Sequence, residues 1–351
     1  MSRRVWKDPK LWIGVLLSTF FVWLALRGLE PGKILLALRG VNYRVLPPAV
    51  ALTLLVIWIR SARWKILLRG LKEVRVGSLF RATAIGFTVN YLLPARVGEV
   101  VRAYVLGMHE GVSSSAAFAT VVVERLLDVF SILVVFVGVM LFVRIPEENP
   151  QLVRTLQATA AVMGTVAASG VVFLWVVRRR TQSLKTFLGR SVGRISPRAG
   201  DVLSRLMESF SSGVAPVHRI RDIIEISIYT AFLWITTAAG VILIAEGLRL
   251  GLPWEAAWLI LVALAFGVSV PSAPGFVGTF HYSAMACLLL YGVPRPEALS
   301  YAILLHATNI LPVLFLGLTL LWREGLTLGG LARMGARVQA TGQDDRAGRP
   351  D

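Results

Sequence analysis

Long apolar segments without charge limit this chain to a fold that satisfies its backbone hydrogen bonds within helices. The longest runs from Ala256 to Pro294 and contains no Lys, Arg, Asp or Glu. One helical span needs roughly 20 residues, about half of this length. Charged residues make up only 16% of the chain, against about 25% in a soluble domain. Because lipid offers no partner to backbone polar groups, we predict an all-α polytopic membrane protein.

Six apolar segments are predicted to cross the membrane completely, within a membrane domain that covers residues 11–322. A basic segment, 1–10, precedes the first span without an A-x-A cleavage site, so we interpret that span as uncleaved rather than as a signal peptide. A polar, glycine-rich tail, 323–351, follows the last span and is predicted to be partly disordered. The predicted spans are 11–26, 45–59, 116–143, 156–177, 223–245 and 298–322.

Two further apolar segments, 79–107 and 256–292, are interrupted near their middle. The first breaks at Pro94, and the second contains PSAPGFVGTFH from Pro271 to His281. Proline removes an N–H and clashes with the preceding helical turn, so neither segment fits one continuous helix. We predict two re-entrant or broken helical hairpins. A membrane-edge loop is the alternative for the first segment, and a kinked, packed helix is the alternative for the second.

Similar spacings within the two broken segments favour an inverted repeat. In each, a glycine at the break is followed by a Gly-Val turn and then, almost as far again along the chain, by an ionisable residue. Three full spans separate the two segments, so the second has the opposite orientation, as in transporters with a mid-membrane site. The landmarks are Gly98, Gly111-Val112 and Glu124, then Gly278, Gly292-Val293 and His306.

The formal net charge of +17 is carried mainly by connections between apolar segments. Anionic lipid headgroups are therefore the expected partner, and nucleic acid is not. With both broken segments re-entrant, most of the 37 Lys and Arg residues lie on the side of the N-terminus. The positive-inside rule then predicts cytoplasmic N- and C-termini in the cell (inner) membrane. Residues 178–221 are predicted to form a basic cytoplasmic loop with an amphipathic helix.

Charges in and after the first broken segment suggest a binding site, because each costs about 2.5–3.5 kcal/mol at mid-membrane on insertion scales. Arg96 stands near a helix start whose free N–H groups favour an anion, and its guanidinium can hold a phosphate in bidentate geometry. Glu99 is expected to pair with Arg96 or Arg102. The residues expected to balance this charge from the next span are Glu124, Arg125 and Asp128.

The second break is expected to supply an opposite gate, because its glycines allow close backbone approach. His281 and His306 are candidates for a role in transport, with packing or hydrogen bonding as the alternative. Asn309 follows His306 within the last span.

Enzyme signatures are missing from the sequence. It contains no GxGxxG, GxxxxGK[ST], HExxH or GxSxG pattern. The single cysteine, Cys287, excludes an intrachain disulfide, and no Cys/His cluster suggests zinc. We therefore expect no enzymatic activity, no cofactor and no metal. The alternatives are a membrane enzyme that acts on a lipid phosphate and a non-transporting scaffold for a lipid synthase.

Together these motifs resemble the transmembrane region of lysylphosphatidylglycerol synthases and the flippase-like membrane proteins that share it. The resemblance covers about residues 11–322 and implies a lipid-translocating region without the C-terminal synthase domain, since only the short segment 323–351 follows Trp322. The family tends to place an acid near His281 and an arginine near His306, so this chain departs from the pattern there. The first motif matches at Asn90, Pro94, Arg96, Gly98, Glu99, Arg102, Glu124, Arg125 and Asp128, and the second at Pro271, Pro274, Gly275 and Gly278.

The sequence therefore predicts a lipid flippase that moves an anionic or phosphate-bearing lipid between leaflets. In this hypothesis Arg96 and Arg102 bind the headgroup, and the nearby carboxylates balance charge or couple protons. Membrane phospholipids are the expected partners, and a lipid-modifying synthase is a further candidate.

Overall fold

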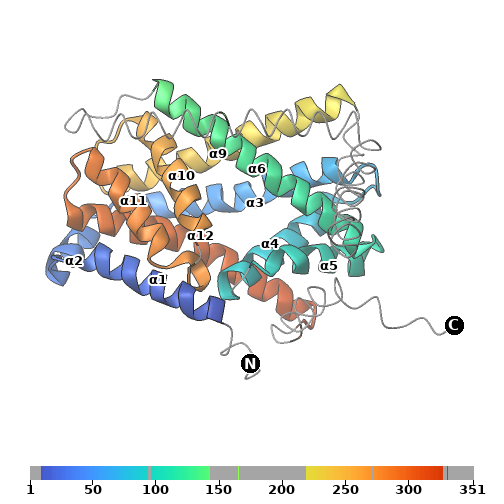
Figure 1. Cartoon of the computed structure of the whole chain (residues 1–351), viewed down its shortest axis with the longest axis horizontal. Helices are drawn as coiled ribbons and strands as arrows, with labels where there is room; N and C mark the ends of the chain where they lie inside the picture. The colour runs from blue at the N-terminus through green and yellow to red at the C-terminus, as the bar shows by residue number, and fades with distance from the viewer. Residues whose placement is uncertain are drawn as a thin grey trace, which may run out of the picture. The chain divides into compact units, whose positions relative to one another are not determined.

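The computed structural model describes residues 9–93, 96–142, 165, 219–270, 272–326 and 330. These residues form α-helices and short 3₁₀-helices and contain no β-strand, which confirms the all-α prediction for this part of the chain (Figure 1). The predicted span 156–177 (apart from Thr165), most of the basic loop 178–221 and most of the tail lie outside the described residues.

Most of the α-helices coincide with apolar segments of the sequence. The helices are α1 Pro9–Leu26, α2 Pro31–Arg39, α3 Leu46–Leu68, α4 Val76–Leu92, α5 Gly98–Glu110, α6 Ser114–Phe142, α9 Ile220–Gly247, α10 Trp254–Ser269, α11 Thr279–Leu290 and α12 Arg295–Arg323, with 3₁₀-helices η2 Tyr43–Val45 and η3 Pro274–Phe276.

Three helical segments of the described part are long and apolar enough to cross a membrane by themselves. They are Tyr43–Leu68, Ile220–Gly247 and Arg295–Arg323. Trp12–Leu26 and Pro31–Arg39 would make a fourth as one broken pair, bent by 78°. The protein is thus a helical membrane protein, and the count of six full spans stays a prediction.

The chain forms two compact units. Unit 1 comprises Met1–Trp58, Phe80–Val105 and Leu233–Asp351, and unit 2 comprises Ile59–Leu79 and Leu106–Phe232. Helices α3, α4, α5 and α9 contribute residues to both units.

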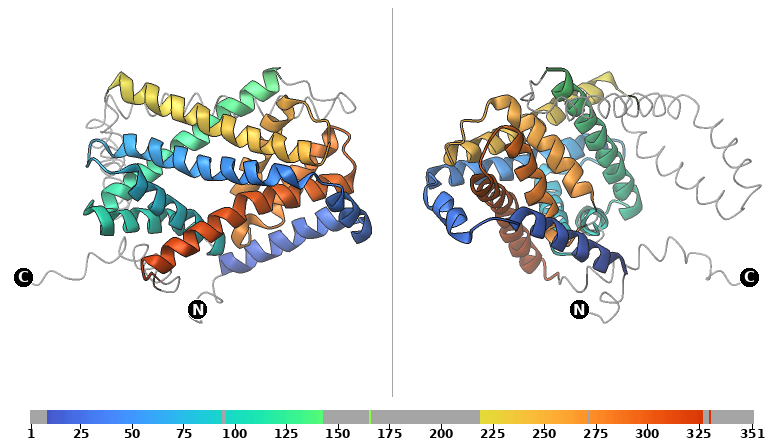
Figure 2. Two further views of the ribbon diagram at one scale, coloured as in Figure 1. Left: turned by 180° about the vertical axis from the view of Figure 1, so that it is seen from behind. Right: turned by 60° about the vertical axis from the view of Figure 1, so that its left-hand side comes forward.

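Two connections expected from hydropathy contain helix. The second span is predicted to end at Ile59, whereas α3 continues to Leu68. Hydropathy ends a span at the first charge, Arg60, but the side chains that follow include the fully buried Trp64. The connection between the first two predicted spans contains α2, which packs against α12. Arg295, at the start of α12, donates to the Leu24 carbonyl near the end of α1, 3.1 Å away. The ribbons of α2 and of the start of α12 lie side by side in Figure 2.

Helix α12 approaches α3 and α4 closely in unit 1. A Cβ added at Gly317 would lie 1.9 Å from the Thr88 hydroxyl, so glycine permits this approach. The Thr88 hydroxyl donates to the Val313 carbonyl at 2.9 Å. Pro312 lies inside α12 and cannot donate to the carbonyl of Thr308, one helical turn earlier. The Thr53 hydroxyl of α3 donates to that carbonyl instead, at 3.2 Å.

Candidate functional site

The first break separates α4 from α5 in unit 1. Its Pro94 lies outside the described residues, and Arg96 adopts the left-handed conformation with φ 53°. The side-chain oxygen of Asn90 accepts the N–H of Gly98 at 2.8 Å. A Cβ at Gly98 would lie only 1.9 Å from the Gly86 carbonyl oxygen. Asn90 and Gly98 therefore hold α4 and α5 in direct backbone contact.

The start of α5 does not offer the free N–H groups that the sequence suggests for anion binding. Gly98 donates to Asn90, and Glu99 donates to the Arg96 carbonyl at 3.2 Å. The next two amides, of Val100 and Val101, both donate to the Val97 carbonyl. Because the side chain of Asn90 and the local turn already accept these amides, anion binding here would fall to the side chain of Arg96, which is exposed.

The second break separates α10 from α11, also in unit 1. Pro271 lies outside the described residues; we call Ser272–Gly278 the gate segment. Gly275, Phe276 and Gly278 all have positive φ, 76°, 58° and 91°. A Cβ at Gly278 would lie 2.5 Å from the Ser18 carbonyl oxygen of α1, so α1 approaches the gate segment at backbone distance.

Side chains from three helices bind the backbone groups of the gate segment. The Ser18 hydroxyl accepts the N–H of Ala273 at 2.7 Å. His281 Nδ1 accepts the N–H of Gly278 in a long bond of 3.4 Å, and His306 Nε2 lies 2.8 Å from the Gly275 carbonyl oxygen. Pro274 begins η3 within this segment. The backbone is thus irregular but hydrogen-bonded.

The two breaks lie side by side within unit 1. Arg96 Nη2 donates to the Val268 carbonyl of α10 at 3.0 Å. The Tyr91 and Phe276 rings pack edge to face with centroids 6.4 Å apart. His306 lies close to the middle of α12. Its bond to Gly275 therefore sets the gate segment near the middle of a helix long enough to span a membrane.

The two histidines are in mutual contact. Their ring centroids are 4.5 Å apart, and Phe280 packs on His306 at 4.7 Å.

Asn309 donates to the Leu305 carbonyl of its own helix at 2.7 Å. Arg102, on α5, is almost fully buried. The expected pairing of Glu99 with Arg96 or Arg102 stays a prediction.

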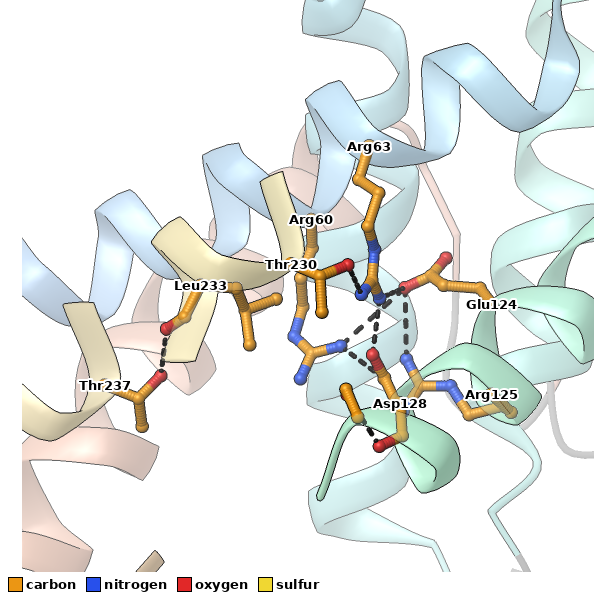
Figure 3. Close-up of polar contacts among 9 residues, drawn as sticks. Arg60, Arg63, Glu124, Arg125, Asp128, Thr230, Leu233 and Thr237 are labelled. Carbon is orange, nitrogen blue, oxygen red and sulfur yellow. Dashed lines mark hydrogen bonds and ion pairs between the residues drawn. The ribbon is translucent and has the colours of Figure 1, made fainter. Parts of the chain in front are cut away.

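Unit 2 contains a cluster of buried ion pairs between α3 and α6, shown in Figure 3. Arg63 and Glu124 are both 0% exposed. Asp128 is 2.5 Å from Arg63 and 2.7 Å from Arg60, and Glu124 is 3.4 Å from Arg63. Arg125 completes the cluster, 3.3 Å from Glu124. Three arginines thus face two carboxylates.

Sequence patterns single out Glu124, Arg125 and Asp128 but not Arg60 and Arg63. The two α3 arginines lie on one face of a helix because they are three positions apart, but that signal appears only if α3 continues beyond Ile59. Thr230 of α9 accepts a further hydrogen bond from Arg63 at 3.1 Å. Glu124 and Asp128 therefore balance arginines of α3, a pairing that sequence spacing does not reveal.

Metal ligands are not grouped in the part of the chain that the structure describes. No three His, Cys, Asp or Glu side chains there are arranged to hold a metal ion.

Comparison with known proteins gives one family and several distant relatives. The family model described as the lysylphosphatidylglycerol synthase TM region matches residues 11–317. The glycosyltransferase AglD of Haloferax volcanii is 26% identical over 87% of this chain, which spans only 53% of that relative's length. A UPF0104 membrane protein of Methanothermobacter thermautotrophicus is 28% identical over 71% of this chain and 76% of that relative's length. A second UPF0104 membrane protein, MJ1595 of Methanocaldococcus jannaschii, is 33% identical over 35% of this chain and 37% of that relative's length. No solved structure matches significantly.

Proposed function

Because this chain belongs to the family of the lysylphosphatidylglycerol synthase transmembrane region, we propose that it is a lipid flippase of the cell (inner) membrane. The lipid would carry an anionic or phosphate-bearing headgroup. The family and the names of the relatives suggest a membrane protein in lipid or glycan-carrier related processes. The proposal of lipid flipping rests on one observation: the two helix breaks lie side by side in unit 1.

Irregular backbone is unfavourable in lipid and is tolerated where it is buried in protein or lines a water-filled path. Transporters use such breaks, brought together by an internal repeat, to build a substrate site near mid-membrane. Helix lengths support a repeat here: α4, α5 and α6 have 17, 13 and 29 residues, and α10, α11 and α12 have 16, 12 and 29. We propose that the two triplets are inverted copies.

Arg96 is the proposed headgroup ligand. One of its guanidinium nitrogens is held by the Val268 carbonyl, which fixes its direction, while the side chain stays exposed. Its left-handed backbone costs roughly 1–2 kcal/mol for a residue with a side chain, and strain of this kind gathers at functional sites. Arg102 and Glu99 follow on α5 as the proposed second cation and its counter-charge. Phospholipids are the proposed partners, and both termini are proposed to be cytoplasmic.

A second candidate function is non-enzymatic support of a lipid-modifying synthase. The observation that favours it is the relative named as a glycosyltransferase, of which this chain matches about half. In this alternative the chain would bind the lipid without moving it. We propose in either case that the chain itself catalyses no covalent change.

The test is lipid movement in vesicles that contain the purified protein, phosphatidylglycerol and a trace of fluorescent phosphatidylglycerol. Dithionite added outside quenches only the outer leaflet, so the quenched fraction reports flipping. Arg96→Ala should slow flipping about tenfold or more, the effect of losing one hydrogen bond to a charged group. Arg249→Ala is the matched control, because Arg249 is also an exposed, left-handed arginine (φ 55°).

Equal rates for Arg96→Ala and the native protein would refute the assigned site. A native rate no faster than in protein-free vesicles would refute flipping and favour the supporting role. Mass spectrometry of the vesicle lipids would detect any covalent change, which would contradict the non-enzymatic assignment.

A further inference from the structure

The hydrogen bonds of the gate segment assign the protons of both histidines. The Gly275 carbonyl can only accept, so His306 Nε2 must carry the hydrogen that binds it. The Gly278 N–H can only donate, so His281 Nδ1 must be bare. Each neutral imidazole therefore has its hydrogen on Nε2 and its basic nitrogen at Nδ1.

An added proton has opposite effects at the two rings. On His306 it would bind Nδ1 and leave the bond to Gly275 intact, now donated by a cation and therefore stronger. On His281 it would occupy the nitrogen that accepts the Gly278 N–H, so that bond would break. Because the ring centroids are only 4.5 Å apart, two positive charges would repel strongly and the pair would hold one proton at a time.

Within the residues that the structure describes, the hydrogen bonds of both imidazoles go to backbone groups, and no ion pair joins either ring to a charged side chain. Helix α11 packs against α1, α10 and α12, and residues 12–26 of α1 carry no charge. Glu255, Arg295 and Glu297 lie toward the other end of α11, about 14 Å along the helix from His281. The remaining charged groups on α2, α4 and α12, and in unit 1 on and just before α5, are Lys33, Arg39, Arg81, Arg96, Glu99, Arg102 and Arg323, and α11 and α12 also carry Tyr282, Tyr301 and Cys287.

Within the described residues, the pair therefore has no fixed counter-ion that would hold a proton permanently. We propose that His281 and His306 form the binding site for a coupling proton, which His306 holds while the gate segment is bound and which releases the gate segment from the start of α11 when it passes to His281. The proton comes from water on one side and returns to water on the other. This inference rests on the proposed flippase function, whose energy source it names.

The coupling is testable in the same vesicles with an imposed pH gradient. One pH unit corresponds to about a tenfold ratio, so one coupled proton should shift the leaflet distribution of the fluorescent lipid by up to about tenfold. The shift should reverse with the sign of the gradient. His281→Gln and His306→Gln should lose this response, so that the leaflet distribution stays the same at every gradient. His109→Gln, at the exposed end of α5, is the control and should keep it.

A second measurement does not depend on transport. Hydrogen exchange of the peptide that contains the gate segment is compared between the native protein and His281→Gln, whose amide oxygen can accept the Gly278 N–H at any pH. The ratio of the two rates cancels the intrinsic effect of pH. It should rise about fivefold on acidification, as expected for one lost hydrogen bond.

A leaflet distribution that ignores the gradient while lipid still flips, or a gradient response that survives His281→Gln, would overturn the proton site and leave the flippase standing. A constant exchange ratio would overturn release of the gate segment. If the native protein moves no lipid at all, the proposed function fails by itself, and a pH-dependent exchange ratio would still support the proton site.

Discussion

Asp128→Asn is expected to destabilise the protein strongly, because Asp128 is shared by all three arginines of the unit 2 cluster. It lies 2.7 Å from Arg60, 2.5 Å from Arg63 and 3.4 Å from Arg125. Without its charge, three guanidinium groups would face the single carboxylate of Glu124. Arg63 is fully buried and cannot turn to water.

The magnitude follows from this burial. Breaking a buried ion pair by removing one partner costs about 3–5 kcal/mol. The side chains of Arg60 and Asp128 are 14% and 13% exposed, so some screening by water remains and the lower value, about 3 kcal/mol, applies. That is roughly a hundredfold change in the unfolding equilibrium constant.

The assay is reversible unfolding in mixed micelles by increasing SDS, followed by far-ultraviolet circular dichroism. Glu30→Gln is the control, because its pair with Lys33 is 72% and 59% exposed and should change stability by less than about 1 kcal/mol. Adding Arg60→Gln to Asp128→Asn restores the native charge difference and should recover part of the loss. A stability of Asp128→Asn within about 0.5 kcal/mol of native would refute the reasoning, since surface substitutions change it that much.

Further predictions concern packing and topology. Gly98→Ala should reduce the yield of folded protein in fluorescence-detected size exclusion, because its Cβ would meet backbone at 1.9 Å, whereas Gly138→Ala, with nothing within 4 Å, should not. Trp64→Phe should cost about 1 kcal/mol in the SDS assay, because it leaves a buried threonine hydroxyl without its indole donor at 2.8 Å; no change would contradict this. In a cysteine-free background, cysteines at Lys72 and Arg295 should react with an impermeant thiol reagent from the cytoplasmic and outer faces respectively, and labelling from one face would refute the predicted orientation.

Hydropathy predicts the helical class because each apolar helix is a local feature of the chain. The end of α3 cannot be predicted in the same way. Arg60 stops an apolar count, yet its charge is matched by Asp128, which lies 68 residues away. Such long-range neutralisation has no local signature, and sequence reasoning misses the arginines of the cluster for that reason.

The sequence predicts which residues belong to the candidate site better than it predicts what those residues contact. The sequence singles out Asn90 and Gly98, but their roles, an amide cap and a backbone contact, depend on how α4 and α5 pack. Reasoning from the helix dipole predicts free N–H groups at the start of α5, but it does not reveal that Asn90 already accepts the first of them. Contact between His281 and His306 likewise requires two helices to meet.

Pro312 and Thr53 illustrate a dependence that reaches across unit 1. The proline leaves the Thr308 carbonyl without its helical donor, and the threonine hydroxyl supplies a substitute. Thr53→Val should therefore be harmful in the native chain but tolerated beside Pro312→Leu, where the helix regains its own N–H. The two positions form an epistatic pair: the effect of a substitution at either one depends on the residue at the other, so mutational scans of single positions would misjudge both.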